Sequence, residues 1–173
     1  LHVALAELAT GGAHQVLESS LRDALGPDYR ERVRPEVAAR HAKPAHPPHP
    51  VNPFGFRDPR VRVLRDLAYA PEHGKRGLLD VYLPAAGATG APVLFQIHGG
   101  GWMIGEKRQQ AMPLMLHLAR RGWVCVAANY RLSPKATFPD HIVDCKRALG
   151  WIREHVAEHG GDPDFVVATG GSA

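Results

Sequence analysis

Two glycine-rich stretches of the chain combine residue types that could carry out acyl transfer. HGGGW occupies positions 98–102, after the apolar run VLFQI, and GGSA occupies positions 170–173, after FVVAT. Glycines let the backbone turn tightly and approach a ligand with free N–H groups, while Ser172 offers a hydroxyl nucleophile. Free N–H donors beside that hydroxyl would stabilise the oxyanion that forms when it attacks a carbonyl group, each by about 3–4 kcal/mol.

Each stretch also has a simpler interpretation. A serine after two glycines is often only part of a turn between a strand and a helix. Three consecutive glycines before a tryptophan are rarer, because they cost conformational entropy and add nothing to a core. A phosphate-binding P-loop is the competing interpretation, since Gly100 and Gly105 have the right interval, but Glu106 precedes Lys107 and no Ser or Thr follows the lysine. The two stretches together therefore favour a serine hydrolase.

The apolar runs around these stretches predict buried strands of a parallel sheet. They span residues 93–97, 123–128 and 165–168, and they are apolar almost throughout, as strands covered on both faces are. Two earlier runs, 61–69 and 79–83, alternate apolar and polar residues as half-buried strands do. Ligands bind outside the carboxyl ends of parallel strands, so both glycine-rich stretches lie where a site is expected.

Two helices are predicted between the apolar runs. The first is predicted over residues 109–121 and is closed by Gly122, and Pro113 fits it only if the helix begins near that residue. The second follows Pro139 and ends at 160–161. An apolar stripe is expected to be the buried side of the second helix, at positions 142, 145, 149, 152 and 156. The order strand, helix, strand, helix, strand indicates a parallel α/β fold.

The first 50 residues have a different pattern and are predicted to be a separate region. Residues 1–40 have helical periodicity broken at Gly11-Gly12, and residues 43–50, KPAHPPHP, indicate a stiff linker or strap. His41, His46 and His49 could hold a metal, but the prolines deny them the spacing of a helix, so no metal site is predicted. We expect residues 1–50 to be a cap or an anchoring arm, and residues 51–173 to be the α/β part.

Composition and charge indicate an ordinary globular protein. Hydrophobic residues make up 45% and charged residues 22% of the 173 residues, and no apolar run approaches the ~20 residues of a membrane span. The net charge is +4, and the densest basic group carries no nucleic-acid-binding motif. It therefore indicates a solvated face rather than a nucleic-acid partner, and it consists of Arg30, Arg32, Arg34, Arg40 and Lys43.

Two further features concern the cysteines and the first residue. Cys125 and Cys145 lie in apolar patterns and are predicted to be buried free thiols. The chain begins with Leu1 rather than Met, so a signal peptide or membrane anchor upstream stays open, and the compartment with it.

With these motifs the chain resembles the hormone-sensitive-lipase-like branch of the α/β-hydrolase esterases. The matching segments lie within residues 61–173 and read LDVYLP, VLFQIHGGGWMIGEK, ANYRLSP, FPDHIVDCKRALGWI and TGGSA. The resemblance implies an α/β-hydrolase fold, here the N-terminal part of a mostly parallel sheet flanked by helices. It also implies a carboxylic-ester hydrolase (an esterase or lipase) that works through an acyl-serine intermediate on small-molecule acyl esters, with no cofactor and no metal.

The resemblance also assigns roles to individual residues. Ser172 corresponds to the nucleophile, and the N–H groups of Gly100, Gly101 and Ala173 correspond to the oxyanion hole. His98 corresponds to the motif histidine that orders the glycine loop, not to the catalytic base; Gly99 and Trp102 complete that motif. The family commonly has a glutamate where this chain has Lys135, so a local pairing of that glutamate with Arg131 is not expected.

The family's catalytic acid and histidine base follow the nucleophile in the chain and are expected beyond Ala173. The family's elbow reads G-x-S-x-G, so the chain is expected to stop just after the nucleophile. None of the aspartates before Ser172 is expected to be that acid: Asp140 is expected at the start of a helix, Asp144 at the surface and Asp162 in a turn. The 173 residues alone are therefore expected to be nearly inactive and prone to associate through an unpaired apolar strand at 165–169.

Two alternatives to an esterase stay open at this point. An arylformamidase-like amide hydrolase would use the same glycine loop, because ester and amide hydrolysis pass through the same oxyanion. A catalytically silent binding module on the same fold would lack the acid or the histidine base downstream.

Overall fold

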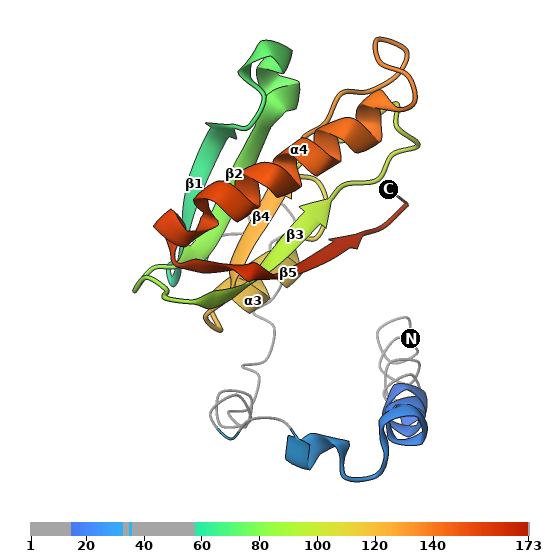
Figure 1. The fold of residues 1–173 in the computed structure, drawn as a ribbon, viewed down its shortest axis with the longest axis vertical. Coiled ribbons are helices and arrows are strands. Elements are labelled where there is room, and N and C mark those ends of the chain that lie inside the picture. Colours follow the sequence, from blue (N-terminus) through green and yellow to red (C-terminus); the bar gives the residue numbers. More distant parts are fainter. Residues whose placement is uncertain (1–14, 33–34, 36–57, 173) are drawn as a thin grey trace, which may run out of the picture. The chain divides into compact units, whose positions relative to one another are not determined.

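A five-stranded mixed sheet with a helix on each face makes up the second of two units, 1–49 and 50–173 (Figure 1). The structure is a computed structural model, and it describes residues 15–32, 35 and 58–172. The strands are β1 (Val61–Ala68), β2 (Leu78–Pro84), β3 (Ala91–Ile97), β4 (Val124–Ala128) and β5 (Gly161–Gly170).

The sheet has the strand order β1-β2-β4-β3-β5. β1 pairs with β2 and β2 with β4 in antiparallel register, whereas β4, β3 and β5 are parallel to one another. All five strands lie where the sequence predicts them, within a few residues, and the last three have the predicted parallel order.

Two α-helices connect the parallel strands and cover opposite faces of the sheet. α3 (Met112–Ala119) joins β3 to β4 and begins at Met112, next to Pro113, as predicted. α4 (Asp140–His155) joins β4 to β5 and continues into the 3₁₀-helix η3 (Val156–His159), which Gly160 closes in a left-handed conformation. In Figure 1, α4 lies in front of the sheet and α3 behind it.

The core consists of two layers, one under each helix, because successive side chains of a strand point to opposite faces. Val93 and Phe95 of β3 pack in the layer of α4, with Ile152, whereas Leu94 packs in the layer of α3, with Met115. All five residues of β4 are buried, as the continuous apolar pattern predicts.

The buried side of α4 differs from the predicted apolar stripe. Asp144, Ala148 and Ile152 are the buried residues of this helix, whereas Ile142 is 46% exposed. The prediction that Asp144 is a surface residue is thus wrong, because a charged partner lies beside it in the fold. Cys145 is half-buried rather than buried, while Cys125 is buried as predicted.

β5 lies at the edge of the sheet, and its apolar side chains are partly exposed. Phe165 is 52% and Val167 42% exposed, since β5 pairs with β3 alone among the described residues. Periodicity shows that these side chains are apolar but not how many neighbours cover them. The strand at 165–168 is therefore confirmed, and one of its edges has no partner strand within residues 58–172, as expected for these 173 residues.

The first unit is described over residues 15–32 and at residue 35. Residues 15–25 are helical, Gly26 ends the helix with a φ of 92°, and the 3₁₀-helix η1 (Tyr29–Arg32) follows. Glu18 accepts hydrogen bonds from Tyr29 and Arg30, and these bonds lower the pKa of its carboxyl group to about 2. The predicted basic group is therefore partly neutralised within this unit.

Several predictions about the first 50 residues fall outside the described part of the chain. They concern Arg34, Arg40 and Lys43 of the basic group, and the histidines at 41, 46 and 49. The role of residues 1–50 as a cap or an anchor stays a prediction.

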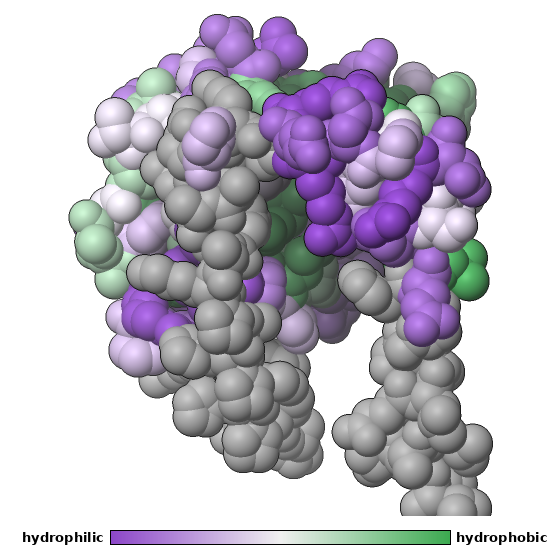
Figure 2. Space-filling view, turned by 90° about the horizontal axis from the view of Figure 1, so that it is seen from below, coloured by the Kyte–Doolittle hydropathy of each residue, from purple (hydrophilic) through white to green (hydrophobic). Residues whose placement is uncertain are grey.

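Figure 2 colours the described residues by hydropathy and shows both hydrophilic (purple) and hydrophobic (green) side chains at the surface. Within residues 15–32, 35 and 58–172, no helix is both long enough and apolar enough to cross a membrane.

Candidate active site

The carboxyl ends of β4, β3 and β5 lie in register at one edge of the sheet. Ile97 at the end of β3 pairs with Ala128 of β4 on one side and with Gly170 of β5 on the other. The chain passes from β3 to β4 on one side of β3, and then from β4 to β5 on the other side of β3. The strand order therefore reverses at this edge, which is where ligands bind in open α/β sheets.

The HGGGW stretch forms a tight loop whose geometry requires glycine. Gly100 has a φ of 132°, and a Cβ atom there would lie 2.2 Å from the carbonyl oxygen of Ile104. That loop is closed by Ile104, whose N–H donates to the Gly100 carbonyl over 3.1 Å. Among the described residues, the N–H groups of Gly100 and Gly101 have no hydrogen-bond acceptor. Two donors are thus left for a ligand.

Ser172 follows β5 in a left-handed backbone conformation that is uncommon for a residue with a side chain. Its φ is 57°, and it is exposed. This conformation is typical of a sharp, strained turn that presents a serine hydroxyl at the end of a sheet. Ala173, the third predicted donor of the oxyanion hole, lies outside the described residues.

The two glycine-rich stretches meet at their backbones. A Cβ atom added to Gly99 would lie 2.0 Å from the carbonyl oxygen of Gly171 and 2.9 Å from that of Ser172. This contact brings the serine and the loop together, as the predicted site requires.

His98 is buried beneath the loop and held in one orientation. Its ring stacks on Tyr130 with 4.4 Å between ring centroids, and the Tyr130 hydroxyl donates to the His98 carbonyl over 2.7 Å. Burial lowers the pKa of the imidazole, so the ring is neutral at pH 7. These contacts support a role in ordering the loop.

A buried ion cluster anchors the far end of the same loop. Lys107 is 4% exposed, and its Nζ atom lies 2.6 Å from an oxygen of Asp66 and 2.9 Å from one of Asp80. Arg108 binds both carboxylates as well. Burial alone would raise the pKa of Asp80, but the bonds from Arg108 and Lys107 outweigh it and lower this pKa.

The segment 105–108 is also tied to neighbouring segments through hydrogen bonds with Asn129 and Arg76. The Lys107 N–H donates to Asn129, directly after β4, and the guanidinium of Arg76 donates to the Gly105 carbonyl. In the sequence, Lys107 suggests only a P-loop, and the residues around it do not match that motif. The signal for the cluster was Asp80, a charge between apolar residues of a predicted strand, because a buried charge needs a partner.

A second buried ion pair fixes the loop after β4. Asp144 accepts hydrogen bonds from the Arg131 side chain at 2.8 and 2.9 Å and from its N–H at 3.0 Å. Arg131 thus pairs with an aspartate of α4 in place of the glutamate that Lys135 replaces. The same loop reaches the glycine loop, because the Ser133 N–H donates to the Trp102 carbonyl over 2.7 Å.

We expect Asp144→Asn to destabilise the protein by about 3 kcal/mol at pH 7, because it leaves the Arg131 charge poorly paired. Burial alone would raise the pKa of Asp144, but the bonds from Arg131 lower it below its unfolded value. The carboxylate therefore stabilises fully above about pH 4, and this contribution is lost as the pH falls through the folded pKa. Unfolding by denaturant at pH 7 and pH 3 should show a smaller acid loss in the variant than in the wild type.

Asp140→Asn is the matched control for that experiment. Asp140 also pairs with Arg131, at 3.2 Å, but its side chain is 38% exposed. An exposed pair contributes at most about 1 kcal/mol. Equal losses from the two variants would contradict the view that the buried carboxylate holds the loop.

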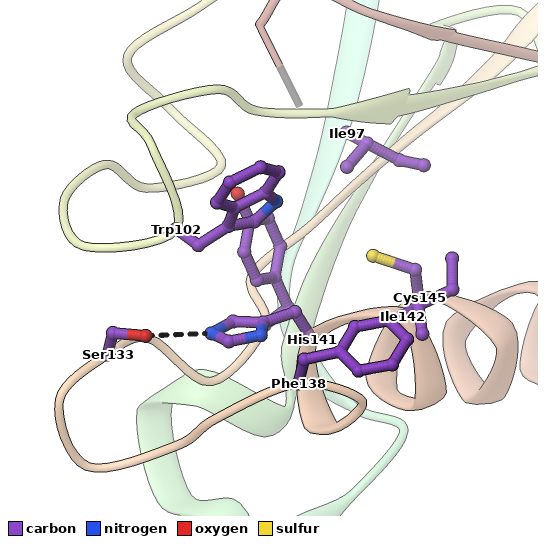
Figure 3. Close-up of a pocket in the computed structure, with 8 residues that line it drawn as sticks. Ile97, Trp102, Ser133, Phe138, His141, Ile142 and Cys145 are labelled. Atoms are coloured by element: carbon purple, nitrogen blue, oxygen red, sulfur yellow. Dashed lines mark hydrogen bonds between the residues drawn. The ribbon is translucent and has the colours of Figure 1, made fainter.

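An apolar pocket of about 550 Å³ opens beside the glycine loop (Figure 3). Its side chains come from the end of β3, from the loops after β3 and β4, and from the start of α4. They are Ile97, Trp102, Tyr130, Ser133, Phe138, His141, Ile142 and Cys145. Sequence analysis did not predict this pocket, because its walls come from segments whose apolar residues read as core.

No group of three or more His, Cys, Asp or Glu side chains that could hold an ion occurs in the part of the chain that the structure describes.

Comparison with known proteins gives one family and several relatives. The BD-FAE family model matches residues 79–173. The probable carboxylic ester hydrolase LipM of Mycobacterium tuberculosis is 48% identical, over 91% of this chain and 37% of LipM. Esterase LipQ of the same organism is 44% identical, over 93% of this chain and 39% of LipQ. The chain thus spans less than two fifths of the length of these two relatives.

Among solved structures, esterase B of Lactobacillus rhamnosis superposes with a TM-score of 0.59 at 23% identity. The match covers 95% of this chain and 45% of esterase B. It agrees with the strand order and layers described above.

Proposed function

Because the chain belongs to the BD-FAE family of α/β-hydrolases, we propose that the full-length protein is a serine carboxylesterase whose nucleophile is Ser172. The family and the fold confirm the resemblance to esterases of the hormone-sensitive-lipase-like branch. The observation that carries the proposal is the contact between Gly99 and Gly171, which joins the exposed, left-handed Ser172 to a loop with two free N–H donors.

The proposed reaction proceeds through an acyl-serine intermediate. A histidine supplied by the rest of the full-length protein would take the hydroxyl proton as Oγ attacks the ester carbonyl. The N–H groups of Gly100 and Gly101 would bind the oxyanion, and the alcohol would leave with that proton. Water would then attack the acyl-serine, release the acid and restore the hydroxyl group.

Small-molecule acyl esters are the proposed substrates, and no cofactor is invoked. The apolar pocket beside the loop supports them, because its volume lies in the range of about 300–1,000 Å³ that small-molecule sites have. A phosphonate analogue of an acyl ester tests the proposal in the full-length protein: it should attach to Ser172, found by mass spectrometry, and abolish hydrolysis of short acyl esters. Hydrolysis of N-formyl arylamines but not of esters would instead favour the amide hydrolase.

Lys107→Met should lower kcat of the full-length enzyme about ten- to a hundredfold with little change in KM, because a small displacement of positioned groups has such effects. The variant removes a buried contact to Asp66 and Asp80, so the glycine loop loses its anchor. Ester hydrolysis is measured together with thermal unfolding, to separate a loosened loop from a lost fold.

Two further variants make that test specific. Lys107→Arg keeps the positive charge and should recover part of kcat. Lys146→Met changes an exposed lysine of α4 and should behave like the wild type. A wild-type kcat for Lys107→Met would show that the cluster does not position the loop.

A further inference from the structure

The pocket in Figure 3 begins next to the proposed reacting groups. Ile97, at its inner wall, pairs with Gly170, two residues before Ser172, and Trp102 follows Gly101 directly. A substrate whose carbonyl lies between Ser172 and the glycine loop would therefore extend its apolar part into this pocket.

One polar pair interrupts the apolar wall. The Oγ atom of Ser133 lies 3.0 Å from the Ala136 carbonyl oxygen and 3.3 Å from Nε2 of His141 (Figure 3). A carbonyl can only accept, so the single hydroxyl proton of Ser133 goes to Ala136. Both bonds then form together only if Nε2 of His141 carries a proton and donates it to Ser133.

This arrangement decides what His141 offers to a ligand. When Nε2 carries the only ring proton, the Nδ1 atom is a hydrogen-bond acceptor, and it has no partner among the described residues. Among the other polar side chains of the wall, Tyr130 is 2% exposed and directs its hydroxyl proton to the His98 carbonyl, whereas the indole of Trp102 can only donate. Burial raises the pKa of the Cys145 thiol to about 11, so it stays neutral.

We propose that His141, held by Ser133, accepts a hydrogen bond from the substrate, so that the enzyme favours esters whose apolar part ends in a hydroxyl or another hydrogen-bond donor. The inference rests on the proposed esterase function and adds the substrate class to it. Ser133 is suited to hold the ring, because its own N–H is bonded to the Trp102 carbonyl across the pocket rim.

The test compares matched substrates in the full-length enzyme. In one arm, methyl esters of ω-hydroxy acids of four to eight carbons are paired with methyl esters that carry a methyl group in place of the hydroxyl. In the other arm, acetates of ω-hydroxy alcohols are paired with the corresponding alkyl acetates. The two arms show whether the acyl or the alcohol part of the ester lies in the pocket.

In one arm the hydroxylated ester should have the higher kcat/KM at the best chain length. His141→Leu should reduce that preference about three- to tenfold, which is the effect of one hydrogen bond between neutral groups. His141→Gln, which keeps an acceptor, should retain more of it. Ile142→Ala, at the same wall, should lower both esters of a pair alike and leave their ratio unchanged.

A preference that His141→Leu leaves intact in both arms would overturn the inference. The inference would also be overturned if kcat/KM did not depend on the chain length of the ester, because another part of the protein would then fill the pocket. Loss of all ester hydrolysis together with failure of the phosphonate to label Ser172 would instead refute the proposed function.

Discussion

Ser172→Ala should reduce the turnover of the full-length enzyme by about a millionfold, because removing the nucleophile of such a site abolishes the covalent route. Ser172 is exposed, so the loss should not come from unfolding. The variant is assayed on short acyl esters, with thermal unfolding as the measure of the fold. A residual rate of about 10³–10⁴ over water is compatible with an intact oxyanion hole.

Ser172→Gly separates the chemistry of this position from its backbone strain. The left-handed conformation at φ 57° costs a residue with a side chain about 1 kcal/mol, whereas glycine adopts it freely. The glycine variant should therefore be as inactive as Ser172→Ala and yet more stable than the wild type by about 1 kcal/mol. Either variant keeping a tenth of the wild-type turnover would rule out Ser172 as the nucleophile.

The positions of the strands and helices were predictable because their signals are local. β4 is apolar throughout, α3 begins beside Pro113, and Gly160 ends η3. The glycine-rich stretches were predictable for the same reason, since each carries its characteristic residues within five positions.

The partners of the buried charges were not predictable, because they are distant in the sequence. Lys107 binds Asp66, 41 residues away, and Arg131 binds Asp144, 13 residues away, so neither pair leaves a spacing that could be recognised. A charged residue is expected to be exposed to solvent unless the fold places a partner of opposite charge beside it. The anchors of the glycine loop therefore emerge from the structure alone.

The pocket was missed because apolar residues look alike whether they fill a core or line a cavity. Ile142 belongs to the predicted apolar stripe of α4 but is 46% exposed, and Phe138, just before this helix, is 85% exposed. His141 and Ser133 lie eight residues apart, and the turn between β4 and α4 brings them together. Their hydrogen bond could therefore not be predicted from the sequence.

Gly100→Ala should lower kcat of the full-length enzyme about 10²- to 10³-fold, as the loss of an oxyanion-hole donor does. The new Cβ atom would lie 2.2 Å from the Ile104 carbonyl oxygen, which belongs to the backbone and cannot move aside alone. The loop must therefore shift, and the N–H groups of Gly100 and Gly101 shift with it. Because they are proposed to bind the oxyanion and not the ground-state ester, KM should change little.

Gly101→Ala is the matched control, and it distinguishes a displaced donor from general strain. Gly101 also has a positive φ, of 58°, but a Cβ atom there would meet nothing within 4 Å. This variant carries only the cost of the left-handed conformation, about 1–2 kcal/mol, and should lose about tenfold in kcat or less. Steady-state kinetics of both variants, with thermal unfolding to confirm that each is folded, measure the difference. Equal losses in the two variants, or a wild-type kcat for Gly100→Ala, would mean that this loop does not supply the donors that stabilise the transition state.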